Sequence, residues 1–147
     1  MKRSPALDVL IRLADESRDA AAGSLGAAVG AAQTAEQKLA LLQRYRDEYA
    51  ERFQVGVSAG LTASGFCNFR AFIGKIDAAI DGQRDLLQKA TGDIDVARDA
   101  WREAAQRQKS YATLATRGDR QAQARESRLQ QKQSDEHAGR AGNRPKI

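Results

Sequence analysis

A cysteine and a histidine can form a nucleophilic pair, and the chain has one of each, Cys67 and His137. Such a pair works only when the two side chains lie within hydrogen-bond reach. Cys67 and His137 are expected at opposite parts of a long helical structure, so we do not expect them to form such a pair. No glycine-rich loop ending in Gly-Lys-Ser/Thr is present to hold a phosphate, and carboxylates on helical surfaces are mostly solvated. The sequence therefore predicts no catalytic residue, no metal, no cofactor and no enzyme activity.

The single cysteine also bears on the compartment in which the chain works. Cys67 has no partner for an internal disulfide, which favours a reducing environment and a cytoplasmic protein. Lys2 and Arg3 are followed by a charged amphipathic segment rather than the apolar core of a signal peptide. No apolar run reaches the length that spans a membrane.

The elements that carry these residues are expected to be long helices. Aromatic residues make up 5% of the 147 residues, and the two prolines, Pro5 and Pro145, lie at the ends. Ser4 before Pro5 is typical of a helix start, because serine caps free amides and proline suits the first helical position. The glycine cluster formed by Gly56, Gly60 and Gly65 predicts a turn between two helices.

Apolar residues recur in steps of four and three along both halves of the chain, which is the heptad pattern of a coiled coil. In each half, twelve of fourteen such positions are apolar, against 41% for the whole chain. We call these positions the seam. The first half of the seam is Leu7, Ile11, Ala14, Arg18, Ala21, Leu25, Ala28, Ala32, Ala35, Leu39, Leu42, Arg46, Tyr49 and Phe53. The second half is Phe69, Ile73, Ile76, Ile80, Gln83, Leu87, Ala90, Ile94, Ala97, Trp101, Ala104, Gln108, Tyr111 and Ala115.

Two matched seams on either side of a turn predict a hairpin. Setting Phe53 opposite Phe69 also places Ala21 opposite Trp101, so that a small side chain meets a large one, as dense packing requires. We therefore expect an all-α fold: a long antiparallel two-helix coiled-coil hairpin with an overhanging C-terminal helix. The expected bounds are a helix over about 5–55, a loop over about 56–66, a helix over about 67–138 and a basic disordered tail over 139–147.

The positive charge is concentrated near the C-terminus. Residues 117–147 hold eight Lys or Arg and four Asp or Glu, which leaves a net charge of +4 out of +5 for the chain. Such a segment can be a solvated helix end, or it can bind nucleic acid, an acidic membrane surface or an acidic protein. It contains no aromatic residue, whereas single-stranded nucleic acid is usually bound with aromatic stacking.

The two flanks of the seam differ in chemistry. The e flank is polar and carries Glu36, Gln43, Arg70, Asp77 and Arg84. The g flank is largely apolar and carries Tyr45, Phe72, Ala79 and Leu86, with Lys38 and Arg52 as its charged members. Exposed aromatic and leucine side chains are typical of protein interfaces, so we expect a binding surface here. The alternative is a third apolar stripe that only widens the core.

The chain resembles the FliJ family, soluble coiled-coil proteins of the bacterial flagellar type III export apparatus. The resemblance spans about residues 7–140 and lies in the joint order and spacing of several residues, none of which is a specific motif alone. These residues are Ala35, Leu39, Leu42, Tyr45, Glu48, Tyr49, Phe72, Ile73, Ala79, Ile80, Trp101, Arg102 and Glu103.

The resemblance implies a non-enzymatic stalk at the centre of the hexameric export ATPase. It also implies contacts with the cytoplasmic region of the membrane export gate and with export chaperones, which would couple ATP hydrolysis to substrate export. The chain is then expected in the cytoplasm, held peripherally at the inner face of the membrane by its partners. By position, the gate-binding face comprises Leu42, Tyr45, Tyr49, Phe72, Ile76 and Ala79, to which the g flank adds Leu86. Lys38 and Gln83 depart from the family's pattern.

Two other functions compete with this one. The basic C-terminal segment suggests a coiled-coil nucleic-acid-binding protein, and the seam alone is compatible with a structural spacer. Neither explains an apolar g flank. A spacer needs none, and nucleic-acid binding predicts aromatic residues within the basic segment, which residues 117–147 lack. We therefore expect protein partners and no nucleic acid.

Overall fold

The fold consists of two long helices, seen in a computed structural model that describes residues 4–142. Helix α1 spans Pro5–Ser58 and helix α2 spans Ala63–Gly142. No strand occurs within 4–142, which confirms the expected all-α helical hairpin. No helix in this range is long and apolar enough to cross a membrane.

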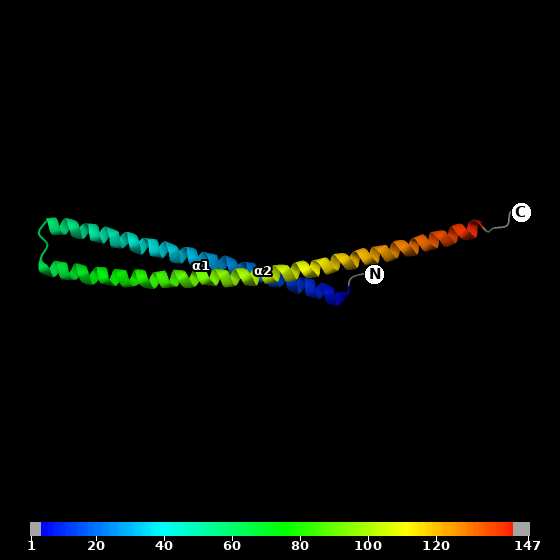
Figure 1. Ribbon diagram of the computed structural model, residues 1–147, viewed down its shortest axis with the longest axis horizontal. Coiled ribbons are helices and arrows are strands. Elements are labelled where there is room, and N and C mark those ends of the chain that lie inside the picture. The colour runs from blue at the N-terminus through cyan, green and yellow to red at the C-terminus, as the bar shows by residue number, and fades with distance from the viewer. Residues whose placement is uncertain (1–3, 143–147) are drawn as a thin grey trace. The chain divides into compact units, whose positions relative to one another are not determined.

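The chain divides into two compact units, which are described separately below. The turn unit is Ala20–Trp101, and the terminal unit combines Met1–Asp19 with Arg102–Ile147. In the turn unit, α1 and α2 leave a short loop and run side by side in opposite directions, cyan and green in Figure 1.

The loop is shorter than the sequence suggested. It covers residues 59–62, because α1 continues to Ser58 and α2 already begins at Ala63. Only Gly60 of the three predicted turn glycines lies in it, with a φ of 92° that an L side chain rarely adopts. Glycine inside a helix costs only about 1 kcal/mol relative to alanine, so Gly56 and Gly65 remain helical.

Side-chain hydroxyls cap the start of both helices. The backbone N–H of Leu7 donates to Ser4 Oγ at 3.1 Å, which confirms the helix start expected at Ser4. At the second helix, the N–H of Gly65 donates to Thr62 Oγ1 at 3.1 Å. Each cap satisfies an amide that has no partner inside its own helix.

The core is the predicted seam. Every buried apolar residue within 4–142 is a seam residue, and among all seam residues only Arg18 is classed as exposed. The buried residues are Ala14, Ala32, Ala35, Ile76, Ile80, Ala104 and Ala115. Five of the seven are alanines, so each layer removes little apolar area from water and stability is spread along the helices.

Polar seam residues bond across to the opposite helix. In the turn unit, Arg46 pairs with Asp77, and Gln83 Nε2 donates to the carbonyl oxygen of Ala35 at 3.1 Å. In the terminal unit, Gln108 Nε2 donates to Asp15 Oδ1 at 2.5 Å. Polar side chains in a coiled-coil seam select a register, because a shifted pairing leaves them without partners.

The expected register places Phe53 opposite Phe69, and the stacking of these two rings tests it. The ring centroids of Phe53 and Phe69 lie 3.7 Å apart in stacked geometry, which confirms that these two residues face each other. The expected contact between Ala21 and Trp101 stays a prediction, although both residues are half-buried.

The basic segment differs from its expected bounds. Helix α2 continues through Gly142, four residues into the range expected to be a disordered tail, while 143–147 lie outside the described residues. From Thr116 to Gly142 every side chain is exposed except that of Ala122, which is half-buried. This part of α2 therefore buries almost no apolar surface within the described chain.

Candidate protein-interaction surface

An uninterrupted chain of aromatic contacts lies beside the loop and joins α1 to α2. Tyr45 meets Phe72 edge-on with centroids 6.1 Å apart, and Phe72 meets Tyr49 at 4.4 Å. Tyr49 in turn stacks on Phe69 at 5.4 Å. From Phe69 the contacts pass through Phe53 to Phe66, so six of the eight aromatic residues form one cluster. The cluster comprises Tyr45, Tyr49, Phe53, Phe66, Phe69 and Phe72, and we call it the aromatic chain.

Heptad spacing positions this cluster. Tyr49, Phe53 and Phe69 occupy the seam, whereas Tyr45 and Phe72 each precede a seam position and so lie on the g flank. An aromatic pair contributes about 0.5–1.5 kcal/mol beyond the area that it buries, so these contacts hold the helices together near the loop. The flank rings are consequently supported by rings in the core.

The predicted binding residues lie at different depths. Tyr45 is 46% exposed and Leu86 57% exposed, and Ala79 is exposed as well. By contrast, Ile76 is only 6% exposed and lies in the core. Leu42, Tyr49 and Phe72 are half-buried between these extremes. The side chains of Tyr45, Ala79 and Leu86, and part of that of Phe72, are thus accessible on the surface, whereas that of Ile76 is not.

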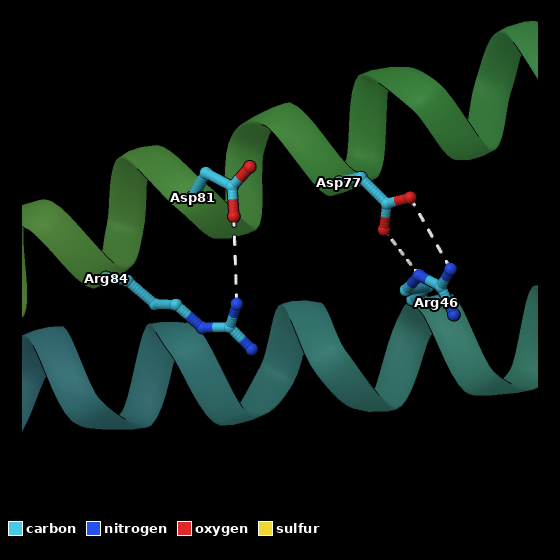
Figure 2. Close-up of polar contacts among 4 residues, drawn as sticks. All are labelled: Arg46, Asp77, Asp81 and Arg84. Atoms are coloured by element: carbon cyan, nitrogen blue, oxygen red, sulfur yellow. Dashed lines mark hydrogen bonds and ion pairs between the residues drawn. The ribbon is translucent and has the colours of Figure 1, made fainter.

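The opposite flank is ionic, and Figure 2 shows its two ion pairs. Arg46 of α1 reaches Asp77 of α2 with Nε–Oδ1 at 2.5 Å and Nη2–Oδ2 at 3.4 Å, an approach through two nitrogens. Next to it, Arg84 of α2 bends toward α1 and lies 3.7 Å from Asp81 of its own helix. These residues, with Gln43, Asp47 and Ile80, line a shallow polar hollow.

The Arg46–Asp77 pair shifts the pKa of both groups. The hydrogen bond from Arg46 lowers the pKa of Asp77 below its usual range, with a further contribution from the positive charge. In turn, the hydrogen bond to Asp77 raises the pKa of Arg46. Both side chains are roughly half exposed, so solvent screens the pair and it acts more on register than on stability.

Phe66 belongs to the aromatic chain but was not among the residues predicted from the sequence. It contacts Phe53 at 5.8 Å and is 46% exposed. The signal was present, because Phe66 lies three residues before Phe69 and so continues the heptad pattern one step toward the loop. Phe66 was missed because it fell inside the loop expected over about 56–66.

Other candidate groups are not brought together. Cys67 is exposed at the start of α2 and His137 is exposed near its C-terminal end. Among residues 4–142 there is no group of three or more His, Cys, Asp and Glu side chains that could hold a metal ion.

Fold and surface together define a coiled-coil hairpin protein with one ionic flank and one apolar, aromatic flank. The pattern of the family described as "Flagellar FliJ protein" matches residues 1–146. The Flagellar FliJ protein of Escherichia coli (strain K12) is 36% identical over 144 residues, covering 98% of both chains. That of Salmonella typhi is 34% identical over the same length and coverage.

The chain belongs to the FliJ family. It is therefore a non-enzymatic component of flagellar protein export, and it interacts with other parts of the export apparatus.

Proposed function

We propose that this protein is a stalk that binds the export ATPase ring, the cytoplasmic region of the export gate and export chaperones, and so couples ATP hydrolysis to substrate export. Membership of the FliJ family supports a place in the export apparatus. In this scheme catalysis belongs to the ATPase. The stalk works in the cytoplasm and reaches the inner face of the membrane through its partners.

The observation that carries the proposal is the exposed apolar row on one flank of the turn unit. Tyr45, Ala79 and Leu86 expose apolar surface there, although the coiled coil is already closed by its seam. Binding energy at protein interfaces is concentrated in a few aromatic and large side chains that become fully buried on binding. A flank of this kind is therefore suited to contact the export gate, with Leu42, Tyr49, Phe72 and Ile76 around and beneath it.

The difference between the flanks supports one preferred binding side. The e flank holds the Arg46–Asp77 pair and the exposed Arg84–Asp81 pair, so burying it would remove water from several charged groups. Burying the g flank removes water from far fewer charged groups, so its desolvation cost is lower. We therefore assign the gate contact to the g flank and leave the e flank in solvent.

Binding to the cytoplasmic region of the export gate, measured by titration calorimetry, tests the proposal. We expect Tyr45→Ala and Phe72→Ala each to weaken binding by about tenfold or more, while the free energy of unfolding changes by less than about 1.5 kcal/mol. The matched control is Glu36→Ala on the e flank, which we expect to leave binding unchanged.

Two results would contradict the proposal. If Tyr45→Ala and Phe72→Ala unfold the protein, these rings belong to the core rather than to an interface. If the intact chain binds neither the gate region nor the export ATPase in co-purification, the stalk function is wrong.

A further inference from the structure

The loop end of the hairpin carries no charge at all. Between Arg52 and Arg70 there is no Asp, Glu, Lys, Arg or His, although 29% of the chain is charged. We call residues 53–69 the uncharged tip. It comprises the last turns of α1, the loop and the first turns of α2.

Large apolar side chains are exposed on this tip. Val55 is 68% exposed and Val57 53% exposed, and both Leu61 and Phe66 also expose a large part of their surface. Water contact with clustered apolar side chains is unfavourable, and such clusters in soluble proteins commonly mark an interaction site. Leu61 and Phe66 also pack within the hairpin, whereas Val55 and Val57 are each more than half exposed.

The tip has a defined shape before any partner binds. Leu61 lies against Gly65 so closely that a Cβ added at Gly65 would be 3.0 Å from Leu61 Cδ1. Thr62 caps the first turn of α2 through Gly65, and Gly60 makes the turn with its positive φ. A preformed surface loses less conformational entropy on binding than a flexible loop does.

The tip is continuous with the aromatic chain. Phe66 contacts Phe53, which stacks on Phe69, and the same contacts lead on to Tyr49 and Tyr45. The ring contacts therefore run from Tyr45 on the g flank to Phe66 on the tip, and Arg52 is the charged g-flank residue that borders the tip.

We propose that the uncharged tip inserts into an uncharged apolar pocket of the partner that binds the g flank, which under the proposed function is the cytoplasmic region of the export gate. Charge selects this occupant. Nucleic acid and anionic lipid are held mainly by Lys and Arg, and the tip has none. Burying residues 53–69 in a protein pocket desolvates no charged group among them, although Glu51 and Arg52 border Val55, so the desolvation cost is small beside that of a charged surface. Contact through the tip is accordingly insensitive to salt.

The test compares full-length variants in binding to the cytoplasmic region of the gate. The double variant Val55→Asp/Val57→Asp should bind about tenfold more weakly or worse, because it places charge in an apolar pocket. Val96→Asp, which changes a valine of α2 that is 70% exposed, is the matched control and should bind like the wild type. Val55→Ser/Val57→Ser should weaken binding less, by the same factor at low and high salt. Circular dichroism melting verifies folding, and the Ser variant decides the question if the Asp variant unfolds.

Several outcomes would overturn this inference. If the wild type binds the gate but the tip variants bind equally well, the tip is not part of the interface, although the proposed function stands. If the wild type does not bind at all, the proposed function fails and takes this inference with it. If the wild type sediments with neutral phosphatidylcholine vesicles and the Asp variant does not, the tip is instead a membrane contact. Self-association lost in the Asp variant, seen by analytical ultracentrifugation, would make it a contact between copies.

Discussion

At the scale of single residues, polar side chains inside the seam decide how the helices meet. Arg46, Gln83 and Gln108 each replace an apolar residue, and each makes a hydrogen bond to the opposite helix. All three are half-buried, so a slipped register that removed their partners would be penalised, though by less than the roughly 1–3 kcal/mol that a fully buried polar group without a partner costs. The alanine layers between them discriminate less, because one alanine packs much like the next.

The Arg46–Asp77 pair makes a pH-dependent contribution to stability. The hydrogen bond from Arg46 lowers the pKa of Asp77 in the folded protein, so Asp77 releases its proton more readily there than in the unfolded chain. The stabilisation is therefore present above the ordinary carboxyl pKa of about 3.9 and is lost as pH falls through the lowered value. We expect Asp77→Asn to be less stable than wild type at pH 7, with the difference disappearing in acid.

Chemical denaturation at a series of pH values measures this difference. Asp81→Asn is the control, because its 3.7 Å contact with Arg84 is solvent-exposed and contributes little. A wild-type advantage over Asp77→Asn that stays constant down to pH values well below 3.9 would contradict the assignment.

At the scale of elements, the loop depends on one glycine. Gly60 has a φ of 92°, where an L side chain costs roughly 1–2 kcal/mol, so Gly60→Ala should destabilise the hairpin by about that amount. Gly82→Ala should have the opposite effect, because a Cβ there meets no atom within 4 Å and alanine is the better helix former by about 1 kcal/mol. Thermal unfolding of both variants tests the pair. A Gly60→Ala variant as stable as the wild type would show that the loop is not held by Gly60.

The C-terminal part of α2 is an element of a different kind. From residue 116 to 142 it buries almost nothing, whereas most of the stability of helices in proteins comes from packing an apolar face against the rest of the fold. We expect limited proteolysis of the free protein to trim it back to near residues 117–125. Because the segment is basic, we expect the export ATPase to protect it. Resistance equal to that of the turn unit would contradict this, as would ATPase binding at moderate salt that survives deletion of the segment.

At the scale of the whole molecule, each unit has its own cross-helix pair with which the expected register can be compared. Phe53 stacks on Phe69 in the turn unit, and Gln108 bonds to Asp15 in the terminal unit. The two pairs lie within one residue of a single antiparallel register.

Disulfide trapping tests that register. In a Cys67→Ser background, cysteines at Leu39 and Gln83 should cross-link readily on oxidation, because the register places them face to face. Replacing Cys67 is necessary because it is exposed and free. Cysteines at Leu42 and Gln83, displaced by one layer, are the control. Faster cross-linking of the displaced pair would show that the register is wrong.

Local sequence spacing was enough to predict the two helices and the residues that pack between them. Heptad spacing is a local property, set by 3.6 residues per turn, so it identified the core layers from Ala14 to Ala115 without knowledge of the partner helix. Ser4 marked the first helix start for the same reason, since capping involves only neighbouring residues.

The length of the loop and the burial of each side chain in the candidate surface depend on contacts between the two helices, which local spacing does not reveal. Gly56 and Gly65 could have joined the turn, but cross-helix contacts among Phe53, Phe66 and Phe69 accompany helices that extend to a four-residue loop. Ile76 and Tyr45 likewise look equivalent as apolar residues of one expected face, yet one is buried and the other half exposed. Burial depends on what the opposite helix places nearby, and that is set only when distant parts of the chain meet.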